Sequence, residues 1–240
     1  VLQQVIWRSP VNLRPILGVK PQESLVGRGY IARAYLIMSG LTGDESYKRR
    51  ARMCLDWLME NKAPGFKEYS WGKMFDFASR GGRQNKFEPI TVWTSLTGMA
   101  FLDAYELLGD RKYLDVANSV CRWILAVPRT VTESGFCINY LGAPRGNGEA
   151  QASLQGDCTI HNQSMLAAAM LARTAGHTRN GEYAEAAREA VKYTCTRQLH
   201  DGSWYYGEDA KYQWIDNFHT GYNLDALKIY IEQTGDRTFE

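Results

Sequence analysis

The stretch LLGDRKYLDVANSVCRW at residues 107–123 carries the pattern that decides the fold. Its Gly-Asp pair at residues 109–110 follows an apolar run and precedes a second helical pattern. In that second pattern Tyr113, Ala117 and Trp123 are spaced so that they share one face of a helix. A glycine ends a helix in the left-handed conformation, and an aspartate caps the helix that follows. The stretch therefore predicts two antiparallel helices joined by a tight turn.

The same pattern recurs along the chain. Gly-Asp pairs at residues 43–44 and 235–236 also close apolar runs, and Asn180-Gly181 lies at the corresponding place in the remaining repeat. Three repeats continue with a tyrosine, an alanine and an aromatic residue at constant spacing: Tyr47/Ala51/Trp57, Tyr113/Ala117/Trp123 and Tyr183/Ala187/Tyr193. The repeat length is on the order of 70 residues, so each unit is one helical hairpin with a long connection to the next.

The two helices of each hairpin differ in composition. The first is apolar or small nearly all round, as at residues 165–172, whereas the second carries a polar stripe. The first helix should therefore be buried and the second should lie at the surface. The helices are predicted near residues 23–40, 45–61, 92–108, 111–126, 160–175, 182–199 and 218–234.

These features predict an all-α fold, an α/α toroid with inner and outer helices and its long loops on one face. We expect residues 23–240 to form the toroid domain and residues 1–22 to be an extended segment that packs on it. A straight α-solenoid is the main alternative, but solenoid repeats and their loops are usually shorter. Because the repeats cannot close a six-hairpin ring, we expect an incomplete ring cut from a longer protein, which could also form a homodimer.

Composition and missing motifs exclude several classes of protein. The net charge is +2 from 28 basic and 26 acidic residues, without a basic cluster, which speaks against nucleic-acid binding. No apolar run is long enough to span a membrane. Five cysteines occur without a CxxC pair, which argues against a metal site and favours the cytoplasm. Phosphate-loop, dinucleotide and GxSxG motifs are absent, so no cofactor is expected.

The long connections at residues 62–91, 127–159 and 200–217 should lie beside the N-termini of the inner helices, where a site is expected. Counted back from the hairpin turns, His161 and His219 fall at nearly the same place in two repeats. Imidazoles at such an entrance can act as general acid and base. The alternative is that each histidine caps its helix or bonds a loop.

The connection at residues 200–217 is also dense in aromatic rings and carboxylates, which suit the stacking faces and hydroxyls of sugars. The alternative is that the rings pack the loops and the carboxylates cap helices, Asp216 especially. The catalytic candidates are His161, His219, Asp216, Asp76 and Asp157. The substrate-binding candidates are Trp71, Arg80, Arg14, Tyr140, Trp204, Tyr206, Glu208 and Trp214, with the two arginines placed to hold carboxylates.

Residues 9–15, 71–80 and 201–222 resemble bacterial exopolysaccharide-biosynthesis proteins of the six-hairpin glycosidase-like superfamily. The superfamily includes unsaturated glucuronyl hydrolases, which rely on aspartates near the inner-helix ends, and sugar 2-epimerases, which rely on a histidine pair. The resemblance thus implies roles for the candidate aspartates in the first chemistry and for the two histidines in the second. Neither family's motif is intact here. Residues 198–204 also resemble the QW repeat of terpenoid cyclases, but the acidic DxDD run of those enzymes is absent.

Three functions remain open at this point. The first is an enzyme that acts on a uronic-acid or amino-sugar polysaccharide by hydrolysis, elimination or epimerisation. The second is a non-catalytic glycan-binding or assembly component of polysaccharide biosynthesis. The third is a terpenoid-cyclase-like toroid.

Overall fold

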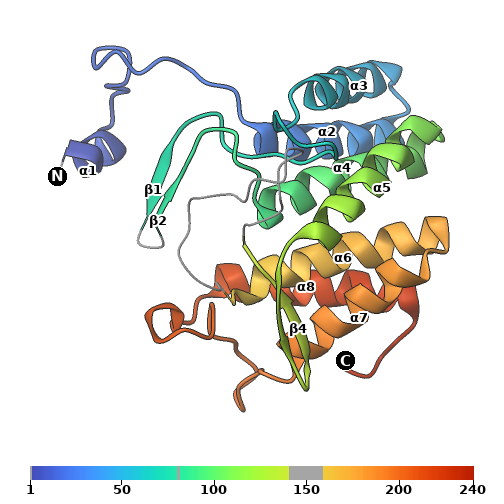
Figure 1. The fold of residues 1–240 in the computed structure, drawn as a ribbon. Helices are drawn as coiled ribbons and strands as arrows, with labels where there is room; N and C mark the ends of the chain where they lie inside the picture. Colours follow the sequence, from blue (N-terminus) through green and yellow to red (C-terminus); the bar gives the residue numbers. More distant parts are fainter. Residues whose placement is uncertain (1, 80–81, 141–158) are drawn as a thin grey trace.

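The structure is a computed structural model that describes residues 2–79, 82–140 and 159–240, and within these ranges it is almost entirely helical (Figure 1). Four inner helices follow one another in space, and each is 18 residues long. Three outer helices each pack on the inner helix that precedes them in the chain. The inner helices are α2 (Leu25–Thr42), α4 (Thr91–Leu108), α6 (His161–Thr178) and α8 (Asn217–Thr234). The outer helices are α3 (Glu45–Glu60), α5 (Arg111–Ala126) and α7 (Gly181–Cys195).

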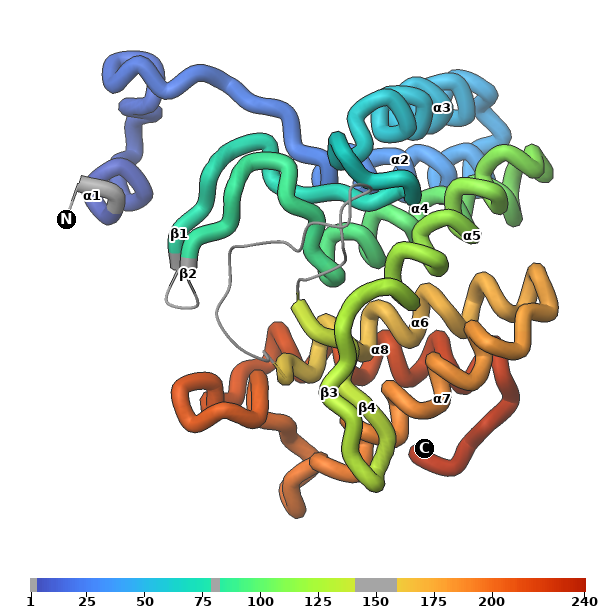
Figure 2. Tube along the Cα trace, viewed as in Figure 1, coloured from blue at the N-terminus to red at the C-terminus, as the bar shows by residue number. Residues whose placement is uncertain are grey.

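The predicted all-α, inner-and-outer arrangement is confirmed. In α6 every residue from His161 to Ala172 is buried, because α4, α7 and α8 pack around this helix. The outer helix α7 instead buries one face and exposes charged residues such as Glu185. The three tight turns lie together on the right of Figure 2, where α8 also ends. The inner helices therefore run parallel, and their N-termini share the opposite end.

The helices at the two ends of the inner row are less covered than α4 and α6. Helix α2 exposes Ile31, Ile37 and Leu41, and α8 exposes Leu224. The row nevertheless curves enough that the two end helices meet, since the hydroxyls of Tyr30 and Tyr222 lie 3.1 Å apart. A homodimer across these faces stays a prediction.

The repeated Gly-Asp pair performs the two tasks expected of it. Gly43, Gly109 and Gly235 end inner helices with φ of 70°, 71° and 71°, in the left-handed region that suits glycine. Asp44 and Asp110 then accept hydrogen bonds from backbone N–H groups of the next helix at 2.8 and 3.0 Å.

The third hairpin turns one residue earlier than predicted. Arg179 occupies the left-handed position with φ of 56°, and Asn180 caps α7, so the pair equivalent to Gly-Asp is Arg179-Asn180. Gly181 is the first residue of α7. Because all four inner helices have the same length, residues at the same rank from the N-terminus are structurally equivalent.

This register corrects the predicted equivalence of the two histidines. His161 is the first residue of α6, whereas His219 is the third residue of α8. The residues equivalent to His219 are Trp93 and Gln163. An offset of two residues turns a side chain by about 200° around a helix, so the two imidazoles face different surroundings.

The long connections contain short elements on the scaffold. Strands β1 (Phe77–Ser79) and β2 (Gly82–Gln84) form one antiparallel hairpin, and β3 (Arg129–Thr132) and β4 (Gly135–Ile138) form another. A 3-10 turn, η1 (Ala210–Tyr212), lies before α8. The second hairpin packs across α7, which requires Gly135: a Cβ there would lie 2.2 Å from the Glu189 carbonyl oxygen.

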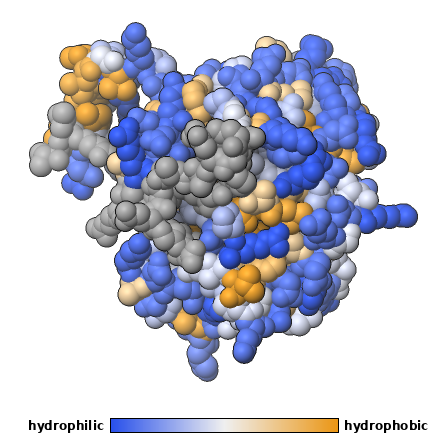
Figure 3. Space-filling view, viewed as in Figure 1, coloured by the Kyte–Doolittle hydropathy of each residue, from blue (hydrophilic) through white to orange (hydrophobic). Residues whose placement is uncertain are grey.

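The N-terminal segment differs from its prediction. Residues Leu2–Arg8 form helix α1 where an extended segment was expected, and this helix stands away from the hairpins (Figure 1). Its apolar side chains, including Trp7 and Ile16, are exposed, as Figure 3 shows for the apolar patch at upper left. Helix α1 departs from the expected extended form, while the division into residues 1–22 and a toroid domain at residues 23–240 stays a prediction.

We expect the substitution Gly109→Ala to lower the free energy of unfolding by about 1 kcal/mol, because a Cβ is strained at positive φ. No atom lies within 4 Å of the added Cβ, so the loss reports backbone strain alone. Gly181→Ala is the matched control, since its site is equally open but lies inside a helix at ordinary φ, and its stability should stay equal or rise. Urea denaturation measures both, and equal losses would contradict the assignment of strain to the turn.

Candidate functional site

The first turn of α8 holds an aspartate–histidine pair. Asp216 is the N-cap, and its Oδ1 accepts the backbone N–H of His219 at 2.8 Å. Its Oδ2 lies 2.6 Å from Nδ1 of the same histidine and 3.1 Å from the indole nitrogen of Trp214. The spacing of three residues from N-cap to histidine thus orients the imidazole through both backbone and side chain.

The charge state of Asp216 determines which nitrogen of His219 carries the proton. Burial raises the pKa of Asp216, but the hydrogen bonds from His219 and Trp214 outweigh burial and hold the pKa below its ordinary value. An ionised carboxylate can only accept, so Nδ1 of His219 donates to it and Nε2 of the neutral ring carries the lone pair. Across residues 2–79, 82–140 and 159–240, no hydrogen bond engages Nε2. The side chain is 28% exposed, so Nε2 is placed to take a proton from a bound molecule.

Aromatic rings border this histidine. Tyr206 stacks on Trp214 with centroids 4.5 Å apart and planes inclined by 18°, and its ring centroid is 4.4 Å from that of His219. Phe218 contacts His219 edge-on at 5.2 Å. Trp214 and Phe218 remain 40% and 67% exposed, so flat apolar faces are available beside the imidazole.

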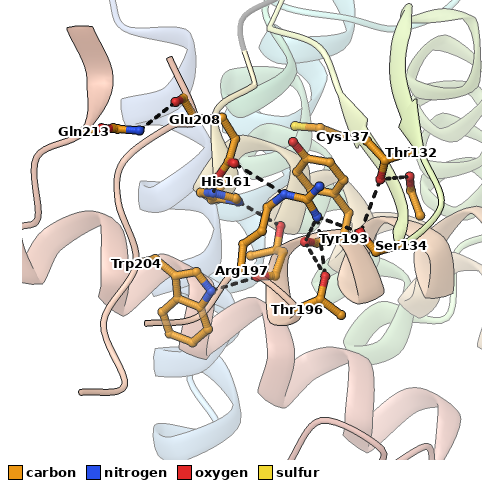
Figure 4. A network of polar contacts seen from close by, with 12 residues as sticks. Thr132, Ser134, Cys137, His161, Tyr193, Thr196, Arg197, Trp204, Glu208 and Gln213 are labelled. Atoms are coloured by element: carbon orange, nitrogen blue, oxygen red, sulfur yellow. Dashed lines mark hydrogen bonds and ion pairs between the residues drawn. The ribbon is translucent and has the colours of Figure 1, made fainter. Parts of the chain in front are cut away.

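His161 has a different environment, as the register shift requires. It is 1% exposed, its Nε2 lies 2.7 Å from Oε1 of Glu208, and its Nδ1 lies 3.4 Å from the hydroxyl of Thr194 (Figure 4). With both nitrogens engaged and the ring buried, His161 cannot contact a substrate in this conformation. We correct its role from catalytic to positioning: it holds the loop that carries Glu208.

The two histidine environments are adjacent because Tyr206 connects them. Its carbonyl oxygen accepts the backbone N–H of His161 at 3.1 Å, while its ring lies against His219. The connection at residues 200–217 is thus held against α6 at Tyr206, and the ring of the same residue forms one wall of the candidate site at α8.

Glu208 is the second carboxylate on this wall. Its Oε2 lies 3.4 Å from Nε of Arg197, whose guanidinium stacks 3.6 Å from the Tyr193 ring centroid and donates to the hydroxyl of Ser134 (Figure 4). The hydrogen bond from His161 is the main cause of the lowered pKa of Glu208, and Arg197 adds to it. Glu208 is thus an ionised, partly exposed carboxylate that suits binding of hydroxyl groups.

Two predicted sugar-stacking tryptophans belong to the core instead. Trp71 is fully buried, stacks on Phe101 and donates its indole N–H to the Leu58 carbonyl at 3.0 Å. Trp204 is 3% exposed and donates to the Thr194 carbonyl at 2.9 Å. Neither ring offers a face to a ligand, so we remove both from the substrate-binding set.

The remaining predicted residues lie in other places. Asp76 closes the β1–β2 hairpin by accepting the Lys86 backbone N–H at 2.8 Å and pairing with Arg83 at 2.9 Å; these two contacts lower its pKa and indicate a structural role in place of a catalytic one. Arg14 is exposed and borders a surface hollow beside Phe75. The Tyr140 carbonyl accepts the N–H of Thr91 at 3.2 Å, at the start of α4.

Arg80 and Asp157 lie outside the described residues. Sequence reasoning also missed Phe218, although its place between Asp216 and His219 in the first turn of α8 was a usable signal. Among the residues the structure describes, no cluster of three or more His, Cys, Asp or Glu side chains could hold a metal ion. Likewise, no helix in that part of the chain combines the length and apolar character of a membrane span.

Comparison with solved structures identifies the fold. The chain is similar to the unsaturated glucuronyl hydrolase of Bacillus sp. GL1, with a TM-score of 0.62, 20% identity and coverage of 94% of this chain and 59% of that one. A family 76 glycoside hydrolase from a bovine Bacteroides thetaiotaomicron strain gives a TM-score of 0.61 at 14% identity, covering 90% and 44%. A D-mannose isomerase gives a TM-score of 0.61 at 13% identity, covering 92% and 58%.

These similarities extend to the fold alone. No protein-family model matches the sequence, and no curated protein matches it significantly. The chain spans about half the length of the solved structures it resembles. Within that span, its three hairpins and fourth inner helix share the α/α-toroid fold of these structures.

The different burial of the two histidines predicts different effects on stability. We expect His161→Ala to lower the free energy of unfolding by about 2–4 kcal/mol, because it leaves a cavity and removes a partner of Glu208. His219→Ala should cost less than about 1 kcal/mol, since that side chain is partly exposed and its backbone N–H still binds Asp216. Urea denaturation of both variants measures the contrast, and a loss at His219 as large as at His161 would refute the assigned roles.

Proposed function

We propose that this chain is a carbohydrate-active enzyme, or the site-bearing part of one, in which His219 moves a proton on a bound sugar. The observation that carries the proposal is the Asp216–His219 pair, with Nε2 unengaged, the exposed ring of Phe218 against the imidazole and the exposed indole of Trp214 bonded to Asp216. The structural neighbours include glycoside hydrolases and a sugar isomerase, which supports a carbohydrate substrate at the level of the fold.

The charge states of the described candidate carboxylates, Asp76, Glu208 and Asp216, support epimerisation, isomerisation or elimination more than hydrolysis by these groups. Glycoside hydrolysis needs a carboxylic acid whose raised pKa keeps it protonated, together with a second carboxylate. Asp76, Glu208 and Asp216 all have lowered pKa values because hydrogen-bond donors surround them. None of these three is thus suited to protonate a glycosidic oxygen, whereas His219 is suited to accept a proton.

In the proposed reaction, Nε2 of His219 removes a proton from a sugar carbon next to a carbonyl or carboxyl group. The Asp216 carboxylate stabilises the imidazolium that forms, as in other carboxylate–histidine pairs. Epimerisation follows when the same carbon receives a proton on its opposite face from solvent or a second acid. Isomerisation follows when His219 returns its proton to the neighbouring carbon and the hydroxyl proton passes to the former carbonyl oxygen. Elimination follows when a leaving group departs with its bonding electrons from the next carbon and a double bond forms. Trp214 supplies the stacking face, and Glu208 accepts hydroxyl hydrogen bonds. We take the substrate to be a uronic-acid or amino-sugar glycan.

Exchange of carbon-bound hydrogen for deuterium tests this function, because epimerisation, isomerisation and elimination all begin with removal of a C–H proton. We expect the wild-type protein in D2O to exchange a sugar C–H proton, as followed by NMR over a panel of uronates, amino sugars and neutral aldoses. His219→Asn should reduce the rate by about 10²–10⁴-fold, the usual contribution of a general base. Asp216→Asn should also be slowed, because it no longer orients the ring as an acceptor.

His177→Asn is the matched control for these variants. His177 also pairs with a carboxylate, Glu106, at 2.7 Å, but near the C-terminal end of α6, so the exchange rate should be unchanged. Persistence of exchange in His219→Asn would eliminate the assigned base. If the protein binds sugars but exchanges hydrogen on none of them, the enzyme proposal fails and a glycan-binding function takes its place.

The role of Trp214 is tested by separating its ring from its N–H group. Trp214→Ala should weaken sugar binding about tenfold, since it removes the stacking face. Trp214→Phe keeps a flat ring but loses the hydrogen bond to Asp216, so binding should be largely retained while exchange slows. Calorimetry and deuterium exchange measure the two effects, and equal affinity of the alanine variant and wild type would contradict the stacking role.

A further inference from the structure

Lys73 holds its ammonium group between two aromatic rings. Its Nζ lies 2.9 Å from the ring centroid of Phe77, in β1, and 4.8 Å from that of Trp93, in the first turn of α4. Cation–π attraction to both rings fixes the position of the charge, while the side chain remains partly exposed. The amine is therefore placed by the scaffold instead of moving freely in solvent.

No ion pair among residues 2–79, 82–140 and 159–240 compensates this charge. Lys48 pairs with Glu45 and Lys112 with Asp56, whereas the ammonium group of Lys73 has the two rings as its neighbours. Burial lowers the pKa of Lys73 to about 8, and no neighbouring carboxylate offsets that effect. An anion bound beside Lys73 would therefore be attracted by an ammonium charge that has no carboxylate partner among the described residues.

The register of the inner helices relates this charge to the proposed site. Trp93 is the third residue of α4, and His219 is the third residue of α8. Equivalent residues of parallel inner helices lie at the same end and face the ring in the same way. Lys73 thus lies at the end of the toroid where His219 and Trp214 lie, and an oligosaccharide bound across that end would meet both.

We propose that Lys73 binds the carboxylate of an acidic sugar, which makes the substrate a uronic-acid glycan and not an amino sugar. This inference rests on the proposed function and selects between the two substrate classes left open there. A uronate carboxylate pairs with the ammonium group, and the apolar sugar face fits the exposed ring of Phe77. The ammonium of an unsubstituted amino sugar would meet a like charge.

Equilibrium binding of methyl glycosides tests the proposal, because these sugars cannot open and their affinity does not depend on turnover. The ligands are methyl glucuronoside, methyl glucoside, methyl glucosaminide and the 6-phosphate and 6-sulfate of methyl glucoside. We expect the wild-type protein to bind the glucuronoside about fivefold more tightly than the glucoside, the gain typical of one partly exposed ion pair. The glucosaminide should bind no better than the glucoside.

Variants assign that preference to Lys73. Lys73→Met should abolish it, and Lys73→Arg should retain most of it, with circular dichroism confirming that both remain folded. Lys86→Met is the matched control, since Lys86 lies on the same hairpin connection over a single ring, Phe87, at 4.7 Å, and it should leave the preference intact. The proposal is overturned if Lys73→Met still prefers methyl glucuronoside over methyl glucoside, or if the wild-type protein shows no such preference. Tighter, Lys73-dependent binding of the phosphate or sulfate ester overturns the assignment to a carboxylate.

The outcomes separate this inference from the proposed function. If His219→Asn abolishes hydrogen exchange on the sugar while Lys73→Met keeps the preference for methyl glucuronoside, only the carboxylate-binding role of Lys73 fails. If no sugar exchanges hydrogen but the preference depends on Lys73, the proposed reaction fails and the carboxylate site stands.

Discussion

The structure depends on the close packing of the inner helices against one another and against the outer layer. Helix α6 shows why this is possible: small residues such as Ala168 let α4, α7 and α8 approach it from different sides. At Gly29 of α2 an added Cβ would lie 3.4 Å from the Thr97 backbone, so the α2–α4 contact is equally close. Helices held so tightly cannot slide, and the residue rank along each one therefore determines where its side chain points.

That constraint accounts for the contrast between the two histidines. The left-handed turn at the end of each inner helix and the equal helix lengths place first residues with first residues and third with third. His161 faces α7 and anchors a loop through Glu208, whereas His219 faces the end of the ring and keeps one nitrogen available. The loop anchored by the first histidine then brings Tyr206 against the second. One histidine supports the candidate site, and the other is the group to which we assign its proposed chemistry.

Much of the fold was predictable because its signals are local. The Gly-Asp turns, the 3.6-residue periodicity and the contrast between apolar and striped helices each require only neighbouring residues. The third hairpin was placed one residue off, since Arg179 adopts the left-handed conformation usually taken by glycine. Of the site, the Asp216–His219 pair was predictable, because a cap and its third residue meet within one turn.

The sequence by itself determined the toroid, its helical repeat and the end of the ring where the candidate site residues gather, because these follow from patterns within a few turns of helix. Only the tertiary structure decided which rings stay exposed. Trp71, Trp204 and Trp214 are chemically alike, but the first two fill spaces between helices while the third stays exposed and bonds to Asp216. Likewise, the unpaired charge of Lys73 depends on which side chains surround it after folding. Burial and charge compensation arise from contacts between segments distant in the chain, and residue type alone does not specify those contacts.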